Sequence, residues 1–77
     1  MNQHDSAKYY FKKGKEYFDS GKYQDAIKCT NDALEIKRDY ALALTTKAES
    51  LSYLGRIYEA LYFVDKALKS HTREHDD

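Results

Sequence analysis

The sequence contains no proline and a single cysteine. Helices tolerate the absence of proline well, whereas turn-rich β folds seldom lack it, so the composition favours a helical chain. The lone Cys29 cannot form an internal disulfide, which fits a reducing, cytoplasmic setting. A chain of 77 residues has room for one small domain. We expect its stability margin to be thin, because small domains bury a smaller share of their surface.

An excess of one charge and long apolar runs are also missing. The 13 basic and 13 acidic residues give a formal net charge of zero, whereas general nucleic-acid binders carry a clear basic excess. No segment approaches the roughly 20 apolar residues that span a bilayer. Residues 1–5 have neither a basic start nor an apolar run, so we expect no secretory signal there. The sequence therefore predicts a partner other than nucleic acid or membrane.

What the sequence does contain is an internal repeat. Residues 7–40 and residues 41–74 can be compared at a shift of 34 positions, and most identities fall at small or apolar residues. These identities pair Ala7 with Ala41, Lys13 with Lys47, Gly21 with Gly55, Ala26 with Ala60, Ala33 with Ala67 and Leu34 with Leu68. The pattern predicts two copies of one structural unit within a single domain over residues 1–77, with polar ends at 1–5 and 71–77.

Within each unit, apolar residues recur at steps of three and four, which is the period of an amphipathic helix. This period predicts helices over roughly 7–19, 23–37, 41–53 and 57–70. Gly21 and Gly55 follow the first helix of each unit, where glycine commonly ends a helix. Asp39 is placed to cap the third helix.

Loops this short make consecutive helices antiparallel neighbours. Gly14 and Ala26 would let the two helices of the first hairpin approach closely, and Ala48 and Ala60 would do the same in the second hairpin. We therefore expect four helices arranged as two hairpins, each closed by small residues at the helix contact.

The spacing of aromatic, small and apolar residues resembles that of the tetratricopeptide repeat family, whose unit is 34 residues long. The residues at the family's positions are Tyr10, Lys13, Gly14, Tyr17, Gly21, Tyr23, Ala26, Thr30 and Ala33 in the first unit, and Leu44, Lys47, Ala48, Leu51, Gly55, Ile57, Ala60, Val64 and Ala67 in the second. Four of them depart from the pattern: Lys13 and Lys47 stand where it has an apolar residue, and Thr30 and Val64 where it has an aromatic one. The proline that often closes each repeat is missing. The resemblance implies an all-α fold of two tandem antiparallel helix-turn-helix repeats, a fragment of a right-handed α-solenoid. It also implies protein binding without catalysis.

In that family the first helices of the repeats line a concave groove that holds a peptide. Carried over position by position, this peptide-binding groove would consist of Lys8, Phe11, Lys12, Lys15, Phe18, Leu42, Thr45, Glu49, Ser52 and Tyr53. Its basic entry and apolar interior suit a peptide with an acidic end and one or two apolar anchors. The alternative interpretation is that Phe11 and Phe18 belong to the core and that the lysines form a solvated face.

The last predicted helix is the most apolar part of the chain, although solenoids usually end in a polar cap. Either another chain covers this helix, or the sequence is part of a larger protein, or the surface stays exposed. The second functional hypothesis is therefore a self-associating scaffold, in which two copies form a homodimer through a shared face. The candidate residues of this self-association face are Tyr58, Leu61, Tyr62, Val64 and Leu68.

Residues that could carry chemistry have plainer explanations in this sequence. His71 and His75 stand four apart and could share a metal on a helix, but a frayed polar tail is the better explanation. Cys29 has no histidine near it in sequence and is explained by packing. The sequence has no glycine-rich phosphate loop, paired catalytic carboxylates or nucleophile elbow. We therefore expect no enzymatic activity, no cofactor and no metal site.

Overall fold

The computed structural model describes residues 3–75, with side chains described over residues 5–70. It contains four helices: α1 (Gln3–Asp19), α2 (Tyr23–Ile36), α3 (Ala41–Tyr53) and α4 (Ile57–His75). These residues include no strand, which confirms the predicted all-α fold. The predicted helix ranges agree closely with these bounds, except that α1 begins before residue 7 and α4 continues beyond residue 70.

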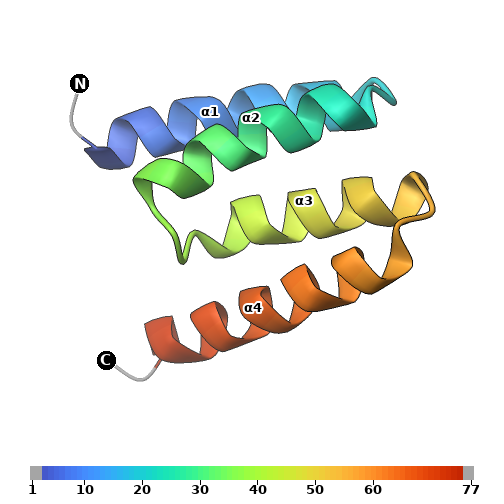
Figure 1. The fold of residues 1–77 in the computed structure, drawn as a ribbon. Helices are drawn as coiled ribbons and strands as arrows, with labels where there is room; N and C mark the ends of the chain where they lie inside the picture. The colour runs from blue at the N-terminus through green and yellow to red at the C-terminus, as the bar shows by residue number, and fades with distance from the viewer. Residues whose placement is uncertain (1–2, 76–77) are drawn as a thin grey trace.

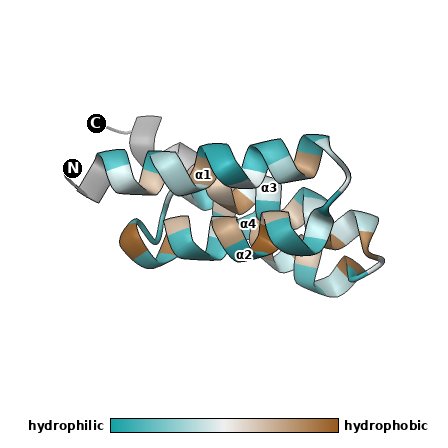
Figure 2. Ribbon diagram, turned by 90° about the horizontal axis from the view of Figure 1, so that it is seen from above, coloured by the Kyte–Doolittle hydropathy of each residue, from teal (hydrophilic) through white to brown (hydrophobic). Residues whose placement is uncertain are grey.

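The four helices form a layered array of two antiparallel hairpins (Figure 1). Helix α3 packs against both α1 and α2, and α4 packs along α3 at the edge of the array. Helix α1 begins, and α4 ends, at the end of the array where α2 is connected to α3. Seen from above, α1 is coloured mainly as hydrophilic, whereas apolar segments gather on the other helices (Figure 2).

The two hairpin turns repeat the same hydrogen-bond pattern around an equivalent glycine. Gly21 and Gly55 have φ angles of 78° and 81°, a left-handed conformation that glycine adopts without steric cost. The amide of Lys22 donates to the carbonyl of Tyr17 at 2.9 Å, and the amide of Arg56 donates to that of Leu51 at 2.9 Å. Together with the glycine amides, these bonds complete a Schellman motif, so the predicted helix stops are confirmed.

Helix α3 begins differently from the prediction. Its N-cap residue is Tyr40, which makes no side-chain capping hydrogen bond, so the prediction of Asp39 as the cap was wrong. Tyr40 is buried in a cluster with Ala7, Ala33 and Ala43. Burial of this ring, rather than a local polar cap, therefore sets where α3 starts, because tertiary packing supplies most of the stability of short helices.

Small residues close the contact between α1 and α2. A Cβ atom at Gly14 would lie 3.0 Å from Thr30 Cγ2 and 3.2 Å from the Ala26 carbonyl oxygen. Thr30 is fully buried and donates its hydroxyl to the carbonyls of Ala26 and Ile27, so it needs no partner from α1. In the second hairpin Ala48 and Ala60 are buried as well, which confirms the predicted role of small residues in both hairpins.

Candidate protein-binding groove

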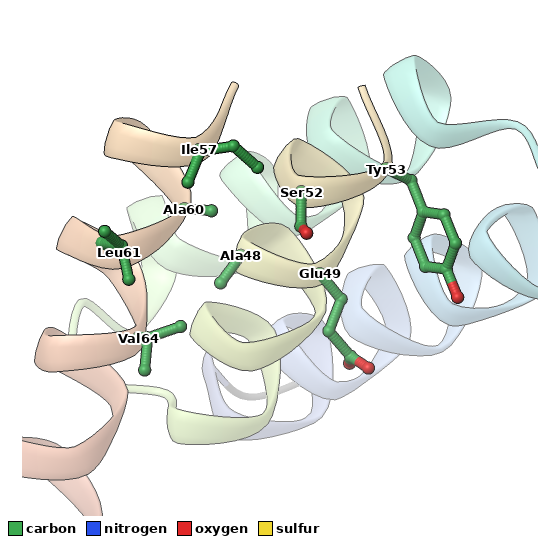
Figure 3. A pocket seen from close by; sticks show the side chains of 8 residues that line it. All are labelled: Ala48, Glu49, Ser52, Tyr53, Ile57, Ala60, Leu61 and Val64. Atoms are coloured by element: carbon green, nitrogen blue, oxygen red, sulfur yellow. The ribbon is translucent and has the colours of Figure 1, made fainter. Parts of the chain in front are cut away.

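A continuous groove runs along the surface between α3 and α4. It consists of two hollows of about 410 Å³ and 340 Å³ that share Ala48, Glu49 and Val64. We call it the open groove. Figure 3 shows the first hollow, with Ala48 on α3 facing Ala60, Leu61 and Val64 on α4. Its full lining is Ala41, Leu42, Thr45, Ala48, Glu49, Ser52, Tyr53, Ile57, Ala60, Leu61, Val64, Ala67 and Leu68.

The α4 wall of the open groove is a stripe of large apolar side chains. Ile57, Leu61, Val64 and Leu68 follow one another at steps of four, three and four, so they lie on one face of the helix. All four are exposed to solvent. The alanines Ala60 and Ala67 are buried beside them against α3, which brings the two helices close and forms the floor of the groove. Such a row of exposed apolar residues is unusual on the surface of a monomer.

The α3 wall contains half of the peptide-binding groove predicted from the sequence. Leu42, Thr45, Glu49, Ser52 and Tyr53 all line the open groove. The predicted peptide-binding groove and the predicted self-association face therefore meet on the same surface. Five residues that line the open groove were not among the predicted site residues, although the repeat relates each to a residue of the first hairpin: Ala41, Ala48, Ile57, Ala60 and Ala67.

The predicted residues on α1 lie elsewhere. The Phe11 ring packs on Tyr40 with centroids 5.6 Å apart, and Phe18 packs on Tyr53 at 5.7 Å. Lys15 forms an ion pair with Asp19 at 3.3 Å. The remaining predicted residues of this helix, Lys8 and Lys12, are exposed. Both phenylalanines thus contribute to packing between α1 and α3, as the alternative interpretation proposed.

An aromatic cluster fixes Tyr53 at one end of the open groove. Its ring stacks on Tyr23 with centroids 4.7 Å apart and an interplanar angle of 5°, and Phe18 packs edge-on against both rings. In Figure 3 the Tyr53 side chain points away from the apolar centre of the hollow. Tyr53 therefore joins the two hairpins more than it forms the floor of the groove.

Two residues of the predicted self-association face lie outside the open groove. Tyr58 and Tyr62 are one helical turn apart on a neighbouring face of α4, and both are exposed. The Tyr62 ring packs edge-on against Phe63, and Lys66 Nζ lies 5.4 Å from its centroid. Only Leu61, Val64 and Leu68 of the predicted face are brought together with the α3 wall.

The open groove contains a single charged lining residue, Glu49, which lies where its two hollows meet. Over the side chains at 5–70, no ion pair or hydrogen bond involves its carboxylate. At one end of the groove, Arg56 Nη2 and Nε each lie 2.8 Å from a carboxylate oxygen of Glu59. This hydrogen-bonded pair lowers the pKa of the Glu59 carboxyl. The groove is therefore apolar with a central negative charge.

Reactive groups have little support in the described part of the chain. Burial raises the pKa of the Cys29 thiol and the nearby Asp32 adds to this rise, so the thiol is less ionised than a free cysteine. Among the side chains at 5–70 the structure groups no three metal-ligating residues, and none of the helices over residues 3–75 is long and apolar enough to cross a membrane. The side chains of His71 and His75 lie outside the described residues.

Comparisons with known proteins agree with this architecture. Residues 1–40, just over half of the chain, match the family described as tetratricopeptide repeat. The chain is 37% identical over 67 residues to an uncharacterized protein of Methanocaldococcus jannaschii, an alignment that covers 84% of this chain and 78% of the relative. No solved structure matches it. With two hairpins 34 residues apart, each closed by the same glycine turn, the chain belongs to the tetratricopeptide repeat family, a non-catalytic fold that generally serves as a protein-interaction module.

Proposed function

We propose that this protein is an interaction module that binds a helix of another protein in the open groove. The main support is the α4 stripe of Ile57, Leu61, Val64 and Leu68, which lines an uncovered groove with alanines at its floor. Helix-in-groove recognition uses apolar anchors at this spacing, and exposed apolar patches commonly mark interaction sites. Membership of the tetratricopeptide repeat family points to the same kind of activity.

This proposal keeps only part of the predicted peptide-binding groove. The α3 residues Leu42, Thr45, Glu49 and Ser52 belong to the open groove and would contact the bound helix. Peptide binding between α1 and α3, with an entry formed by Lys8 and Lys12, stays a prediction.

The proposal can be tested with a displayed library of helical peptides selected on the whole immobilised chain. Selected peptides should lose binding to Leu61→Lys, which places a charge in the groove, and keep binding to the matched control Tyr58→Lys. Both positions are exposed, so both variants should fold. Circular dichroism would confirm their helix content.

Three outcomes would contradict the proposal. The first is a failure to select any binder from the library. The second is that peptides bind Leu61→Lys as well as they bind the wild-type chain. The third is that their binding depends on Lys8→Glu and Lys12→Glu instead, which would move the site to the predicted groove between α1 and α3.

The second candidate function is self-association of the chain through the same stripe. Its four-three-four spacing reads the same in both directions, so an antiparallel copy would bring Ile57 opposite Leu68 and Leu61 opposite Val64. Sedimentation equilibrium over a hundredfold concentration range tests this idea. A mass near twice 9.0 kDa that Leu61→Lys abolishes would support it, and a monomer at every concentration would exclude it.

A further inference from the structure

The chain contains its own example of a filled groove. The groove between α1 and α2 is related to the open groove by the 34-residue shift, and α3 occupies it. At equivalent positions, Ile27 is 8% exposed and Leu61 is 58% exposed, while Thr30 is 0% exposed and Val64 is 43% exposed. The two grooves are therefore built alike, but the first is covered by α3 and the second is exposed. The helix that covers the first groove indicates which kind of helix fits the second.

Helix α3 offers small side chains to the groove that it fills. Ala43, Thr46 and Ser50 lie at i, i+3 and i+7 and are all buried. The Ser50 hydroxyl donates to the Thr46 carbonyl at 2.8 Å, so its hydrogen bond is made within its own helix and it needs no partner from the groove. Leu44 and Leu51 follow Ala43 and Ser50 directly and are buried as well, Leu51 in a cluster with Ile27 of α2 and Ala60 of α4. This face lets two helices approach closely without leaving a buried polar group unpaired.

We infer that the open groove recognises a partner helix with this same face: Ala, Ser or Thr at i, i+3 and i+7, with leucine at i+1 and i+8. The inference rests on the proposed function and specifies the partner. It follows because the small, buried residues Ala48, Ala60 and Ala67 of the open groove stand at the positions equivalent to Gly14, Ala26 and Ala33 of the covered groove. A helix with bulky residues on that face would be held away from the floor.

A second copy of this chain cannot supply that helix through α1. The α1 residues equivalent to Ala43, Thr46 and Ser50 are Tyr9, Lys12 and Glu16. Stacking α1 into the open groove would bury the lysine and glutamate, and the loss of hydration of two buried charges can exceed what their pairing gains. Helix α1 of a second copy is therefore a poor occupant of the open groove.

Charge adds one further feature to the partner helix. In the first repeat the residue equivalent to Glu49 is Lys15, which is paired with Asp19. In the second repeat the position of Asp19 is taken by Tyr53, so nothing in residues 5–70 pairs with Glu49 in the same way. A lysine or arginine at the edge of the partner helix would complete this pair, and it would be screened by salt.

The test uses a synthetic peptide with the α3 sequence, residues 39–54, added to the whole folded chain. A lactam between lysine introduced at Thr45 and the native Glu49 keeps the peptide helical, because both positions are exposed when α3 fills its groove. Fluorescence anisotropy should show saturable binding to the wild-type chain. Leu61→Lys and Leu68→Lys should each weaken it roughly tenfold or more, and Tyr58→Lys should leave it unchanged.

The matched control peptide carries Thr46→Lys and Ser50→Glu, the residues that α1 has at these positions, and it should not bind. The inference is overturned if the α3 peptide fails to bind, if the control peptide binds equally well, or if Leu61→Lys has no effect. If library-selected helices still bind the groove while the α3 peptide does not, the proposed function survives and only the identity of the small-residue face is wrong. The inference is also overturned if the chain binds itself through α1. This would be seen as oligomers of the wild-type chain that become more stable in the Lys12→Ala variant.

Discussion

The covered groove between α1 and α2 and the open groove between α3 and α4 have similar side chains, but only the former is covered by another helix. Both have small residues at the floor, a glycine turn at one end and an apolar second helix. In the first groove these side chains form the core of the protein, and in the second they form its most apolar surface. Burial of a position in a helical repeat is thus decided by the neighbouring unit, because one repeat cannot bury its own face.

The largest effect is expected where the two grooves differ most in exposure. Ile27→Ala leaves a cavity under α3 and should lower the free energy of unfolding by about 2–5 kcal/mol. The equivalent Leu61→Ala removes an exposed side chain, so it should change that free energy by less than about 0.5 kcal/mol. Urea unfolding followed by circular dichroism measures both. Equal losses in the two variants would show that the open groove is covered in solution.

Replacing a small residue of each groove by leucine should also distinguish the two grooves, with a smaller loss of stability. Ala26→Leu forces a large side chain between α1 and α2 and should cost about 1–3 kcal/mol. Ala60→Leu should cost less, because Ala60 borders the open groove and a leucine there can lean into it. Thermal unfolding at one protein concentration ranks the two variants. If Ala60→Leu is the more damaging, the groove is narrower than described.

The aromatic cluster that ties the two hairpins together should have a moderate effect. Tyr53→Ala removes the stacked contact with Tyr23 and should cost about 0.5–1.5 kcal/mol. Tyr58→Ala is the control, since its ring is exposed and should be close to neutral. Chemical unfolding of both variants gives the difference. A neutral Tyr53→Ala would mean that Phe18 and Tyr23 hold the junction without it.

The smallest expected effect on stability comes from the Arg56–Glu59 pair beside the second hairpin turn, and it depends on pH. Arg56 lowers the pKa of Glu59 below the ordinary value of 4.5, so the pair stabilises the folded chain above that value. The stabilisation is lost as the pH falls through the lowered pKa. The equivalent Lys22 and Asp25 form no such ion pair within the described side chains. Melting temperatures between pH 7 and pH 3 should show a small acid-dependent loss that Glu59→Gln reduces and Asp25→Asn does not.

The repeat made most of the fold predictable from the sequence. The 34-residue identities, the glycine stops and the apolar period define four helices and their order, because these signals are local and occur twice. The cap of α3 was not predictable in this way, since Tyr40 is fixed by residues far away in sequence. The site was found only in part. Leu42 and Leu61 were assigned to two different surfaces, and it takes the packing of α4 along α3 to place them in one groove.

The position of the end of α4 has a consequence for how such a protein could be lengthened. Because α4 ends at the same end of the array as α2, a copy fused after α4 would begin in the way that α3 begins after α2. Duplication of the gene alone would still fail to extend the superhelix, since the second copy would arrive with Lys12 and Glu16 on its joining face. Three substitutions, Tyr9→Ala, Lys12→Thr and Glu16→Ser, would give the first helix of the first repeat the joining face that α3 has in the second.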